Sequence, residues 1–425
     1  MAKSSPDTSS PTISDRGAVR LTADWLRHPA LARLIDVLAA AGGPPRLVGG
    51  CVRDAVLGRP VTDIDLATPV PPEAVKSALE HSGIKVVPTG LDHGTVTAVI
   101  DGKGYEITTL RRDVETDGRR AVVAFTDDWR EDAARRDFTI NAMSASPDGK
   151  IYDYFGGLAD AQAGCVRFVG DPAARIGEDY LRVLRFFRFQ AWYGRQPPDE
   201  TAVEALAAGV SGLGRLAAER VRSEVVKWLA APDPLPSWRL AQQTGVAAWL
   251  FDDVPDARLR RLIRRENDLG VAPDPMRRLA AFVLPPGDGA EATAEKLRLS
   301  KAEQRYLATV EAAAGAGPSV QSDIDARRLA YKYGPGVARD ALLLGSSPDD
   351  TLRRWLLALS RWSIPTFPVG GSDANSAGLS RGPEIGAALK AVERWWIQQD
   401  FKPDRAACLE RLGQWVQDNG GETGT

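Results

Sequence analysis

The sequence has little of what disulfide-rich and metal-thiolate proteins need. Its 425 residues include three cysteines, Cys51, Cys165 and Cys408, which are too few and too scattered for a disulfide framework or a zinc site. A reducing compartment fits this usage, and we expect a cytoplasmic protein. The chain also has only three histidines, and none follows His93. This excludes a histidine-rich metallohydrolase domain in the C-terminal half.

Long apolar runs and a charge excess of one sign are missing as well. No run of 18 apolar residues occurs, so we expect no membrane-spanning helix, and the first residues lack the apolar core of a signal peptide. Lysine and arginine number 54 against 56 aspartates and glutamates, a net charge of −2. Any surface for nucleic acid therefore has to be local.

The remaining composition is that of a globular protein, with 44% hydrophobic and 26% charged residues. Strand and helix patterns mix up to about residue 170, and long helical patterns follow, interrupted by proline-rich links. We therefore predict an α+β protein. We expect a disordered tail at 1–22, a mixed α/β domain at 23–170, and helical regions at 171–232 and 233–425.

The clearest chemical signal is the sequence Asp63-Ile64-Asp65. The alternating pattern of residues 62–67 predicts a strand, which would place both aspartates on one face. Two adjacent carboxylates repel each other unless a cation lies between them, and hard oxygen ligands of this kind suit Mg²⁺. Two aspartates on a solvated strand are the alternative, because this tripeptide is common.

A glycine pair precedes the two aspartates. Gly49 and Gly50 lie between a predicted strand and a predicted helix, a turn that lets backbone N–H groups approach a phosphate. Arg53, in the first turn of that helix, is a candidate to bind a triphosphate oxygen. The alternative is a surface arginine that pairs with Asp54.

Together these motifs resemble the signature of bacterial class II tRNA nucleotidyltransferases. These are CCA-adding enzymes of the polymerase-beta superfamily, with poly(A) polymerases as close relatives. The similarity continues through further motifs in order, within about residues 46–228: 47–58 (LVGGCVRDAVLG), 62–68 (TDIDLAT), 105–111 (YEITTLR), 135–142 (RRDFTINA), 175–189 (RIGEDYLRVLRFFRF) and 219–224 (ERVRSE).

The resemblance implies a nucleotidyltransferase head at 23–170, a helical neck at 171–232 and an RNA-binding body and tail at 233–425. Asp63 and Asp65 would be catalytic metal ligands in a two-metal reaction. Glu106 is a candidate third ligand, or a surface acid at a strand edge. Arg136 and Asp137 would bind the phosphate and ribose of the nucleotide, although a salt-bridged turn is the alternative. Gly50 and Arg53 would also contact the nucleotide.

The helix that we expect from about Glu178 bears on base selection. Asp179 and Arg182 are three residues apart, so we expect them on one helix face. In the family, the corresponding residues act as a protein template for the incoming base. Arg185 and Arg188 continue a local basic patch. An ordinary salt bridge between Asp179 and Arg182 is the alternative.

The function implied is addition of C, C and A to the tRNA 3′ end from CTP and ATP, with Mg²⁺ as cofactor and the tRNA acceptor arm as partner. The charged stretch 112–120 predicts a mobile loop. The family needs a loop there to switch from C to A addition, and a hairpin tip without a role is the alternative.

Other functions remain open at this stage. A poly(A) polymerase or an enzyme that adds part of CCA shares the head motifs. A small-molecule nucleotidyltransferase usually has a Gly-Ser opening, and a non-catalytic RNA-binding protein would lack a metal ligand. Five arginines between Arg258 and Arg265 would either meet RNA phosphates or belong to a solvated helix. The C-terminal tryptophans are predicted to pack in helical cores.

Overall fold

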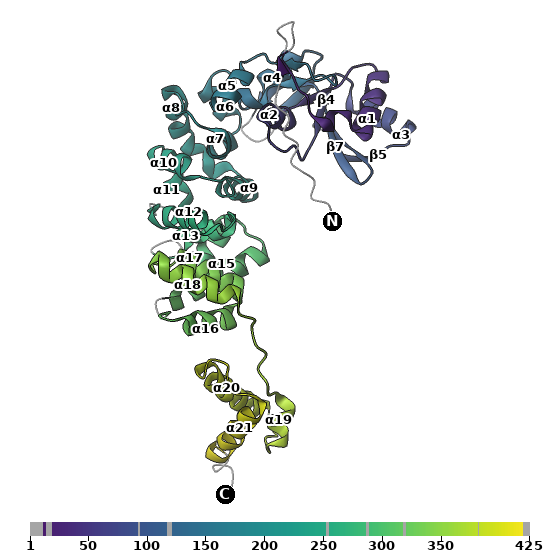
Figure 1. Ribbon diagram of the computed structural model, residues 1–425. Helices are drawn as coiled ribbons and strands as arrows, with labels where there is room; N and C mark the ends of the chain where they lie inside the picture. Colours follow the sequence, from purple (N-terminus) through teal and green to yellow (C-terminus); the bar gives the residue numbers. More distant parts are fainter. Residues whose placement is uncertain are drawn as a thin grey trace. The chain divides into compact units, whose positions relative to one another are not determined.

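The computed structural model describes residues 12–13, 19–91, 94–116, 121–251, 255–285, 289–317, 320–380 and 382–419. Its architecture is α+β, as predicted, with strands confined to the N-terminal part and helices after it (Figure 1). The chain divides into two compact units, 1–254 with 296–298, and 255–295 with 299–425. Within the described residues, no helix is both long and apolar enough to cross a membrane.

The first unit is built on a seven-stranded sheet with the order β11-β10-β3-β4-β7-β6-β5. Only β4 and β7 pair in parallel, and the other neighbours are antiparallel. The strands are β3 (Arg46–Val48), β4 (Asp65–Thr68), β5 (Lys85–Gly90), β6 (Thr95–Ile100), β7 (Lys103–Thr109), β10 (Ser144–Ala145) and β11 (Ile151–Tyr152).

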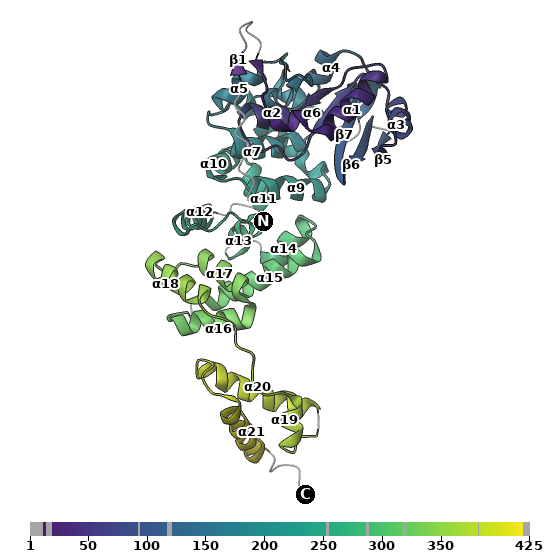
Figure 2. The same cartoon turned by 45° about the vertical axis from the view of Figure 1, so that its right-hand side comes forward.

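The turn between β6 and β7 is a hairpin, as the sequence Asp101-Gly102-Lys103-Gly104 between two strand patterns predicts. Asp101 and Gly102 have φ angles of 52° and 77°, the left-handed pair that a tight hairpin turn needs. On β6, Val96, Ala98 and Ile100 are buried while the alternate residues are not. The helix α3 (Pro72–His81) packs on β5 and β6 and contacts α1 (Pro29–Ala40) (Figure 2).

A second, two-stranded sheet follows β7. It consists of β8 (Arg111–Thr116) and β9 (Ala121–Phe125), which are antiparallel. The prediction of a loop over 112–120 is therefore wrong for residues 112–116, which are a strand. Residues 117–120 lie outside the described residues. The two valines and the phenylalanine of β9 have high strand propensity, which favours this pairing.

Residues 19–22 of the predicted tail 1–22 are part of the folded unit. The amide of Leu21 donates to the carbonyl of Gly149 over 2.8 Å, and Leu21 is 4% exposed. The short strands β1 (Thr12–Ile13) and β2 (Val19–Arg20) pair with each other. The other predicted boundaries, at 170 and 232, fall inside the first unit and stay predictions.

The remaining elements of the first unit are short helices and the helical region after residue 171. They are η1 (Asp24–Arg27), α2 (Gly50–Val56), α4 (Trp129–Ala134), η3 (Thr139–Asn141), α5 (Gly157–Ala163), α6 (Pro172–Glu178), α7 (Leu181–Tyr193), α8 (Glu200–Gly209), η4 (Val210–Arg215), α9 (Ala218–Leu229), α10 (Leu235–Gln243) and α11 (Val246–Phe251).

Aromatic side chains fix α7 to the sheet domain and to the helices that follow. Phe186 lies 5.5 Å from Phe168 and 6.0 Å from Phe138 between ring centroids. On the same helix, Phe187 stacks on Trp228 of α9 at 5.3 Å. All five rings are nearly inaccessible to solvent. Their packing therefore holds α7 rigidly beside the sheet domain.

The second unit is helical throughout its described residues. Its helices are α12 (Ala257–Leu269), α13 (Pro275–Val283), α14 (Gly289–Lys296), α15 (Lys301–Ala316), α16 (Asp323–Tyr333), α17 (Pro335–Leu344), α18 (Asp349–Ser360), α19 (Gly371–Ser376), α20 (Gly382–Gln398) and α21 (Arg405–Asn419). Trp355 and Trp396 are 2% exposed, which confirms the predicted core role for these two tryptophans.

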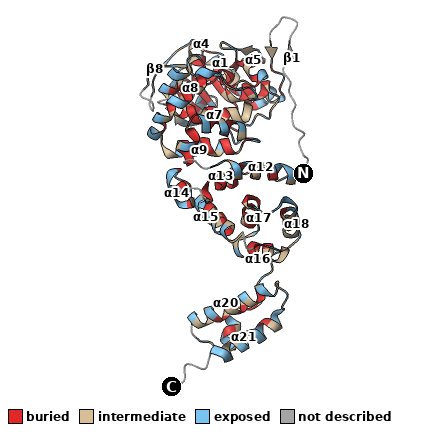
Figure 3. Ribbon diagram, turned by 90° about the vertical axis from the view of Figure 1, so that its left-hand side faces the viewer, coloured by how far each residue is buried: buried red, intermediate tan, exposed pale blue. Residues whose placement is uncertain are grey.

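The helices α12, α13 and α17 contact one another (Figure 3), and buried charges join them. Glu266 accepts from Arg277 over 2.7 Å and from Arg278 over 2.8 Å, and Arg277 also contacts Asp340 at 3.1 Å. All four side chains are at most 5% exposed. Because each charge has a partner, removing one alone would leave an uncompensated buried charge and destabilise this unit strongly.

Candidate active site

One cavity of about 640 Å³ in the first unit collects most of the predicted site residues. Its walls come from the turn between β3 and α2, from β4 and β7, from the segment after α4, and from α7 and α9. The lining residues include Gly49, Gly50, Arg53, Asp65, Glu106, Arg136, Asp137, Asn141, Asp179, Arg182, Arg185 and Arg220. Of the predicted residues, Asp63 and Arg188 are not among those that line it.

The carboxylates come together through the parallel pairing of β4 and β7. Asp65 and Glu106 are direct neighbours in the strand register. Asp63 lies just before β4 rather than within it, because the strand begins at Asp65. Ile64 is 3% exposed, whereas Asp63 is exposed and Asp65 is half-buried. The exposure of residues 63–65 thus alternates as predicted, although the observed strand starts three residues later than the predicted strand 62–67.

Burial and negative charge act together on Asp65. Burial, then the charges of Glu106 and Asp63, raise the pKa of Asp65 from 3.8 to about 6, although the charge of Arg136 opposes the shift. The three acids are therefore close enough to repel one another electrostatically. A carboxylate cluster of this kind is the donor set that a hard divalent cation takes up.

The same carboxylates do not form a closed metal cage by themselves. Among the described residues, no group of three or more histidine, cysteine, aspartate or glutamate side chains is arranged to hold a metal ion. An open site fits Mg²⁺, which keeps several waters and takes phosphate oxygens as ligands beside one or two carboxylates. The donors thus suit an ion that completes its coordination with a substrate.

The glycine turn brings a cation close to the backbone. Gly49 has φ 68° and ψ −121°, a conformation that side-chain-bearing residues rarely adopt. A Cβ atom there would lie 3.1 Å from Nη1 of Arg136. The lack of a side chain at Gly49 therefore lets Arg136 approach the start of α2, and both residues line the same cavity as Asp65.

Arg53 is buried and bound by protein groups, whereas an arginine that binds a triphosphate oxygen was expected to be accessible. It is 7% exposed, and it donates to both carboxylate oxygens of Asp54 and to Oδ1 of Asn141 over 2.6 Å. The structure therefore favours the alternative pairing with Asp54, except that the pair is largely buried. Arg53 still borders the cavity, and it positions Asn141 there.

Arg136 and Asp137 belong to a network that includes two residues the motif reading did not assign. Asp132 is 3% exposed and binds Arg136 through Oδ2 at 3.1 Å. Asn141 donates to Asp137 over 3.0 Å. Burial raises the pKa of Asp137, but the charge of Arg185 and hydrogen bonds from Asn141 and Arg185 outweigh it, so its pKa lies below the usual value.

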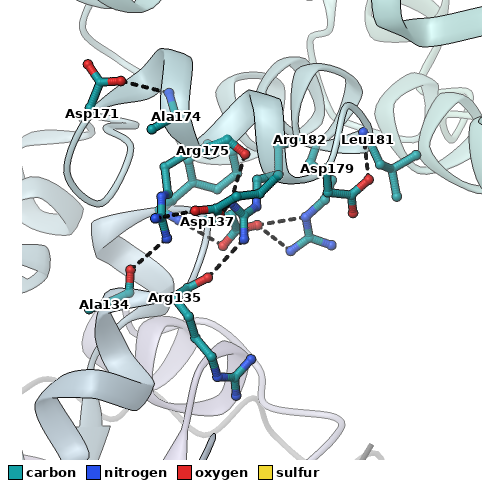
Figure 4. Close-up of polar contacts among 12 residues, drawn as sticks. Ala134, Arg135, Asp137, Asp171, Ala174, Arg175, Asp179, Leu181 and Arg182 are labelled. Atoms are coloured by element: carbon teal, nitrogen blue, oxygen red, sulfur yellow. Dashed lines mark hydrogen bonds and ion pairs between the residues drawn. The ribbon is translucent and has the colours of Figure 1, made fainter. Parts of the chain in front are cut away.

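Asp179 is not in a helix, in contrast to the prediction of a helix from Glu178. The helix α6 ends at Glu178, and Asp179 is extended, with φ −153° and ψ 107°, before α7 begins at Leu181. Its Oδ1 accepts from the amide of Leu181 over 3.0 Å (Figure 4). Its Oδ2 accepts from Arg220 over 2.7 Å. The aspartate is therefore held by the first amide of α7, one residue before the N-cap residue Tyr180, and by a side chain of α9.

The predicted alternative, a salt bridge between Asp179 and Arg182, does not form. Arg182 pairs with Glu178, and its Nη1 and Nη2 donate to the carbonyls of Arg175 and Arg135 over 2.8 and 2.9 Å (Figure 4). Because Arg182 is tied on three sides, its guanidinium is fixed before any nucleotide binds. Asp179 and Arg182 both face the cavity with different partners.

The residue between Asp179 and α7 is also anchored. The ring of Tyr180 lies so close to Gly212 of η4 that a Cβ atom there would be 2.1 Å from the ring carbon Cδ1. Only a glycine at 212 leaves room for this ring. The connection between α6 and α7 is therefore seated on η4.

The predicted basic patch on α7 is largely neutralised. Arg185 pairs with Asp137 at 2.5 Å, and Arg188 pairs at 2.7 Å with Glu224, which is 5% exposed. Arg188 therefore acts through packing on α9 rather than inside the cavity. Sequence reasoning missed Arg220 and Glu224 as functional positions, although both lie in the motif at 219–224.

The sheet, the carboxylates and the glycine turn together have the features of a nucleotidyltransferase head. Two family models match the chain, "Poly A polymerase head domain" over residues 45–167 and "Probable RNA and SrmB- binding site of polymerase A" over 198–257. Both matches lie largely in the first unit.

Relatives extend the similarity over nearly the whole chain. The mitochondrial CCA tRNA nucleotidyltransferase 1 of Mus musculus is 34% identical, covering 90% of this chain and 89% of its own. A CCA-adding enzyme of Leuconostoc mesenteroides is 41% identical over 52% of this chain and 54% of its own. The chain belongs to the family of CCA-adding enzymes and poly(A) polymerases.

Solved structures agree with the fold. The CCA-adding enzyme of Bacillus stearothermophilus in complex with CTP has a TM-score of 0.72 and 25% identity, over 91% of this chain and 97% of that one. The Thermotoga maritima CCA-adding enzyme complexed with tRNA has a TM-score of 0.68 and 23% identity, over 92% and 97% of the two chains. The latter shows the common fold alone.

The raised pKa of Asp65 predicts a pH-dependent gain in stability for Asp65→Asn without divalent metal. A pKa of about 6 in the folded state against 3.8 means that ionised Asp65 destabilises the fold. The gain should be negligible below pH 4, increase from pH 4 to 6, and reach about 3 kcal/mol in the free energy of unfolding above that. Denaturant unfolding in EDTA at several pH values measures it, with Glu73→Gln on α3 as the control. A gain that does not change with pH would contradict this assignment.

Proposed function

We propose that this protein adds C, C and A to the 3′ end of tRNA, using CTP and ATP and releasing pyrophosphate. The observation that carries the proposal is that one cavity is lined by the carboxylates of β4 and β7 and also by Asp179 and Arg182. The same cavity thus offers a place for a triphosphate and a place for a base. The names of the relatives support this substrate pair.

The carboxylates would hold the cofactor, which we propose is Mg²⁺. Asp63 and Asp65 are its ligands, and Glu106 joins them on the side of β7. When bound, a pair of such ions stabilises the attacking and leaving oxygens of an in-line displacement. The protein's own part is to fix Asp65 and Glu106 on neighbouring strands, while the charge of Arg136 favours the ionised form of Asp65.

The phosphate and ribose contacts fall to the groups around the glycine turn. Arg136 lies beside Gly49, where the backbone amides at the start of α2 are also within the cavity. Asp137 is ionised, because its pKa is lowered, and it can accept a hydrogen bond from a ribose hydroxyl. Arg185 holds the Asp137 carboxylate in place at 2.5 Å.

The base contacts fall to Asp179 and Arg182. Each carboxylate oxygen of Asp179 accepts one hydrogen bond from the protein and keeps a second lone pair. That lone pair suits the exocyclic amino group of cytosine or adenine, which guanine and uracil do not present at this position. Arg182 keeps N–H donors beyond those bound to Glu178 and the two carbonyls, and these suit ring nitrogen acceptors.

We further propose a member of the bacterial class II branch that works in the cytoplasm. The ordered motifs from residue 47 to residue 224 support the branch. All three cysteines are free, and Cys51 and Cys408 are buried, which supports a reducing compartment. The tRNA acceptor arm is the proposed partner of the helical body and tail.

The proposed reaction is tested with purified protein, tRNA that lacks its 3′ CCA, CTP, ATP and Mg²⁺, followed by sequencing of the product. We expect a product that ends in CCA and stops there. A product that ends in CC would show partial addition, and a long A tract would show a poly(A) polymerase. No extension with any nucleotide would contradict the proposal.

The metal assignment predicts the effect of Asp65→Ala. Incorporation of CTP should fall by at least about a thousandfold, because a carboxylate ligand of the reaction centre is lost. Affinity for tRNA, measured by filter binding, should stay within about twofold, since the helical body and tail, and not Asp65, are proposed to bind the acceptor arm. Glu73→Ala, on the exposed side of α3, is the control with an equal charge change and should keep full activity. Near-normal turnover of Asp65→Ala would refute the role.

The contact of Arg220 with Asp179 predicts a loss of base selection in Arg220→Gln. Without the hydrogen bond at 2.7 Å the carboxylate is free to rotate, so we expect the ratio of kcat/KM for CTP over UTP to fall about tenfold. The affinity for the triphosphate should change much less. Lys227→Gln, which removes a charge from the exposed side of the same helix, should keep the wild-type ratio. An unchanged ratio in Arg220→Gln would show that Arg220 does not position Asp179.

A further inference from the structure

The five arginines between Arg258 and Arg265 are not equivalent. Arg260 pairs with Asp256 at 2.7 Å, and Arg264 and Arg265 both pair with Asp349 at 2.8 Å. Three of the five charges are therefore balanced by carboxylates within the second unit. Arg258 and Arg261 differ, because among the described residues they form no ion pair with a carboxylate and contact carbonyl oxygens instead.

Arg258 and Arg261 bind the ends of two helices. Arg258 donates to the carbonyls of Ala281, Leu284 and Pro285 over 2.6 to 3.1 Å, at the end of α13. Arg261 donates through Nη2 to the carbonyl of Leu344 over 3.1 Å, at the end of α17. The Nε atom of Arg261 is buried without a hydrogen-bond partner in the described part of the chain.

Both arginines line one cavity of about 660 Å³, which lies wholly within the second unit. Its walls come from α12, α15, α17 and the turns after α13 and α17. The turn after α17 adds the polar residues Ser346 and Ser347. Apolar side chains form much of the remaining surface: Leu284, Ala314, Val320, Ala341, Leu342 and Leu344. A volume of this size is within the range of sites for small organic ligands.

The cavity carries an excess of positive charge. Burial and the charge of Arg261 lower the pKa of Arg258, and burial followed by the charges of Arg265 and Arg264 lowers the pKa of Arg261. Glu311 also borders the cavity, where its carboxylate accepts weakly from the amide of Ala290 at 3.4 Å. One carboxylate against two guanidinium groups leaves a net positive site.

We propose that this cavity binds a phosphate ester with an attached apolar body, that is, one nucleotide unit. The two guanidinium groups supply the forked N–H donors that phosphate oxygens accept. The apolar wall supplies a surface for the sugar and base. The nucleotide comes either from an RNA strand or from a free nucleotide, and this site is separate from the cavity of the first unit.

The test places a carboxylate in the cavity without cutting the contacts of either arginine. Ala314 lines the cavity from α15, and Ala312 lies on the exposed side of the same helix. We therefore compare Ala314→Glu with Ala312→Glu, which have the same change of residue and charge. Binding of AMP and of an unstructured oligoadenylate RNA is followed by hydrogen exchange of the backbone amides at 345–347.

In the wild type and in Ala312→Glu, we expect AMP or the RNA to slow exchange at 345–347 in a saturable way. In Ala314→Glu the apparent affinity should fall by about tenfold or more, because the new carboxylate repels phosphate and occupies the space. Protection by AMP alone identifies a free nucleotide, and protection by the RNA identifies a strand. No protection by either probe in the wild type would overturn the proposal, as would equal protection in both variants.

A second variant keeps the test decisive if Ala314→Glu does not fold. Ser346→Glu adds a carboxylate from the exposed turn on another wall, and its folding is checked by its thermal melting profile. It should also weaken binding by about tenfold. The exchange readout is local to residues 345–347 and needs no turnover. Failure of the proposed CCA addition would therefore leave this result unchanged, and the two proposals are tested separately.

Discussion

The repulsion among Asp63, Asp65 and Glu106 is the constraint on which the first unit depends. The parallel pairing of β4 and β7 forces Asp65 and Glu106 into neighbouring positions, so the fold itself concentrates negative charge. Burial, and after it the charges of Glu106 and Asp63, raise the pKa of Asp65 to about 6, and the charge of Arg136 offsets only part of this shift. The remaining charge is what a cation and a triphosphate would balance, so the energy held in this cluster becomes binding energy for the substrate.

Other charged groups of the cavity have protein partners of opposite charge. In this they differ from the acids of the sheet, which are the proposed metal ligands. Asp137 pairs with Arg185 at 2.5 Å, and Asp179 pairs with Arg220 at 2.7 Å. The second unit follows the same rule in its buried cluster around Glu266. Among the described residues, the acids of the sheet repel one another, and Arg258 and Arg261 of α12 form no ion pair with a carboxylate.

The sequence predicted the α+β class, the β6–β7 hairpin, the glycine turn and the closeness of the acids, because these follow from local patterns and ordered motifs. It did not predict the break at Asp179, since helix-forming residues continue across 178–182 and the cause is a distant partner, Arg220 on α9. The burial of Arg53 was missed for the same reason: Asn141 lies 88 residues away. Single-sequence patterns carry little information on such tertiary contacts.

The seating of Tyr180 on Gly212 has a consequence for how this family diversifies. Asp179 lies on a short connection between two firmly held helices. The orientation of its carboxylate therefore depends on the hydrogen bond from Arg220 and on the space that Gly212 leaves for Tyr180, rather than on the packing of a whole helix. If Asp179 selects the base as proposed, substitutions at Arg220 can change nucleobase preference while leaving the hydrophobic interior intact. Base selectivity and the stability of the fold can then change independently during evolution.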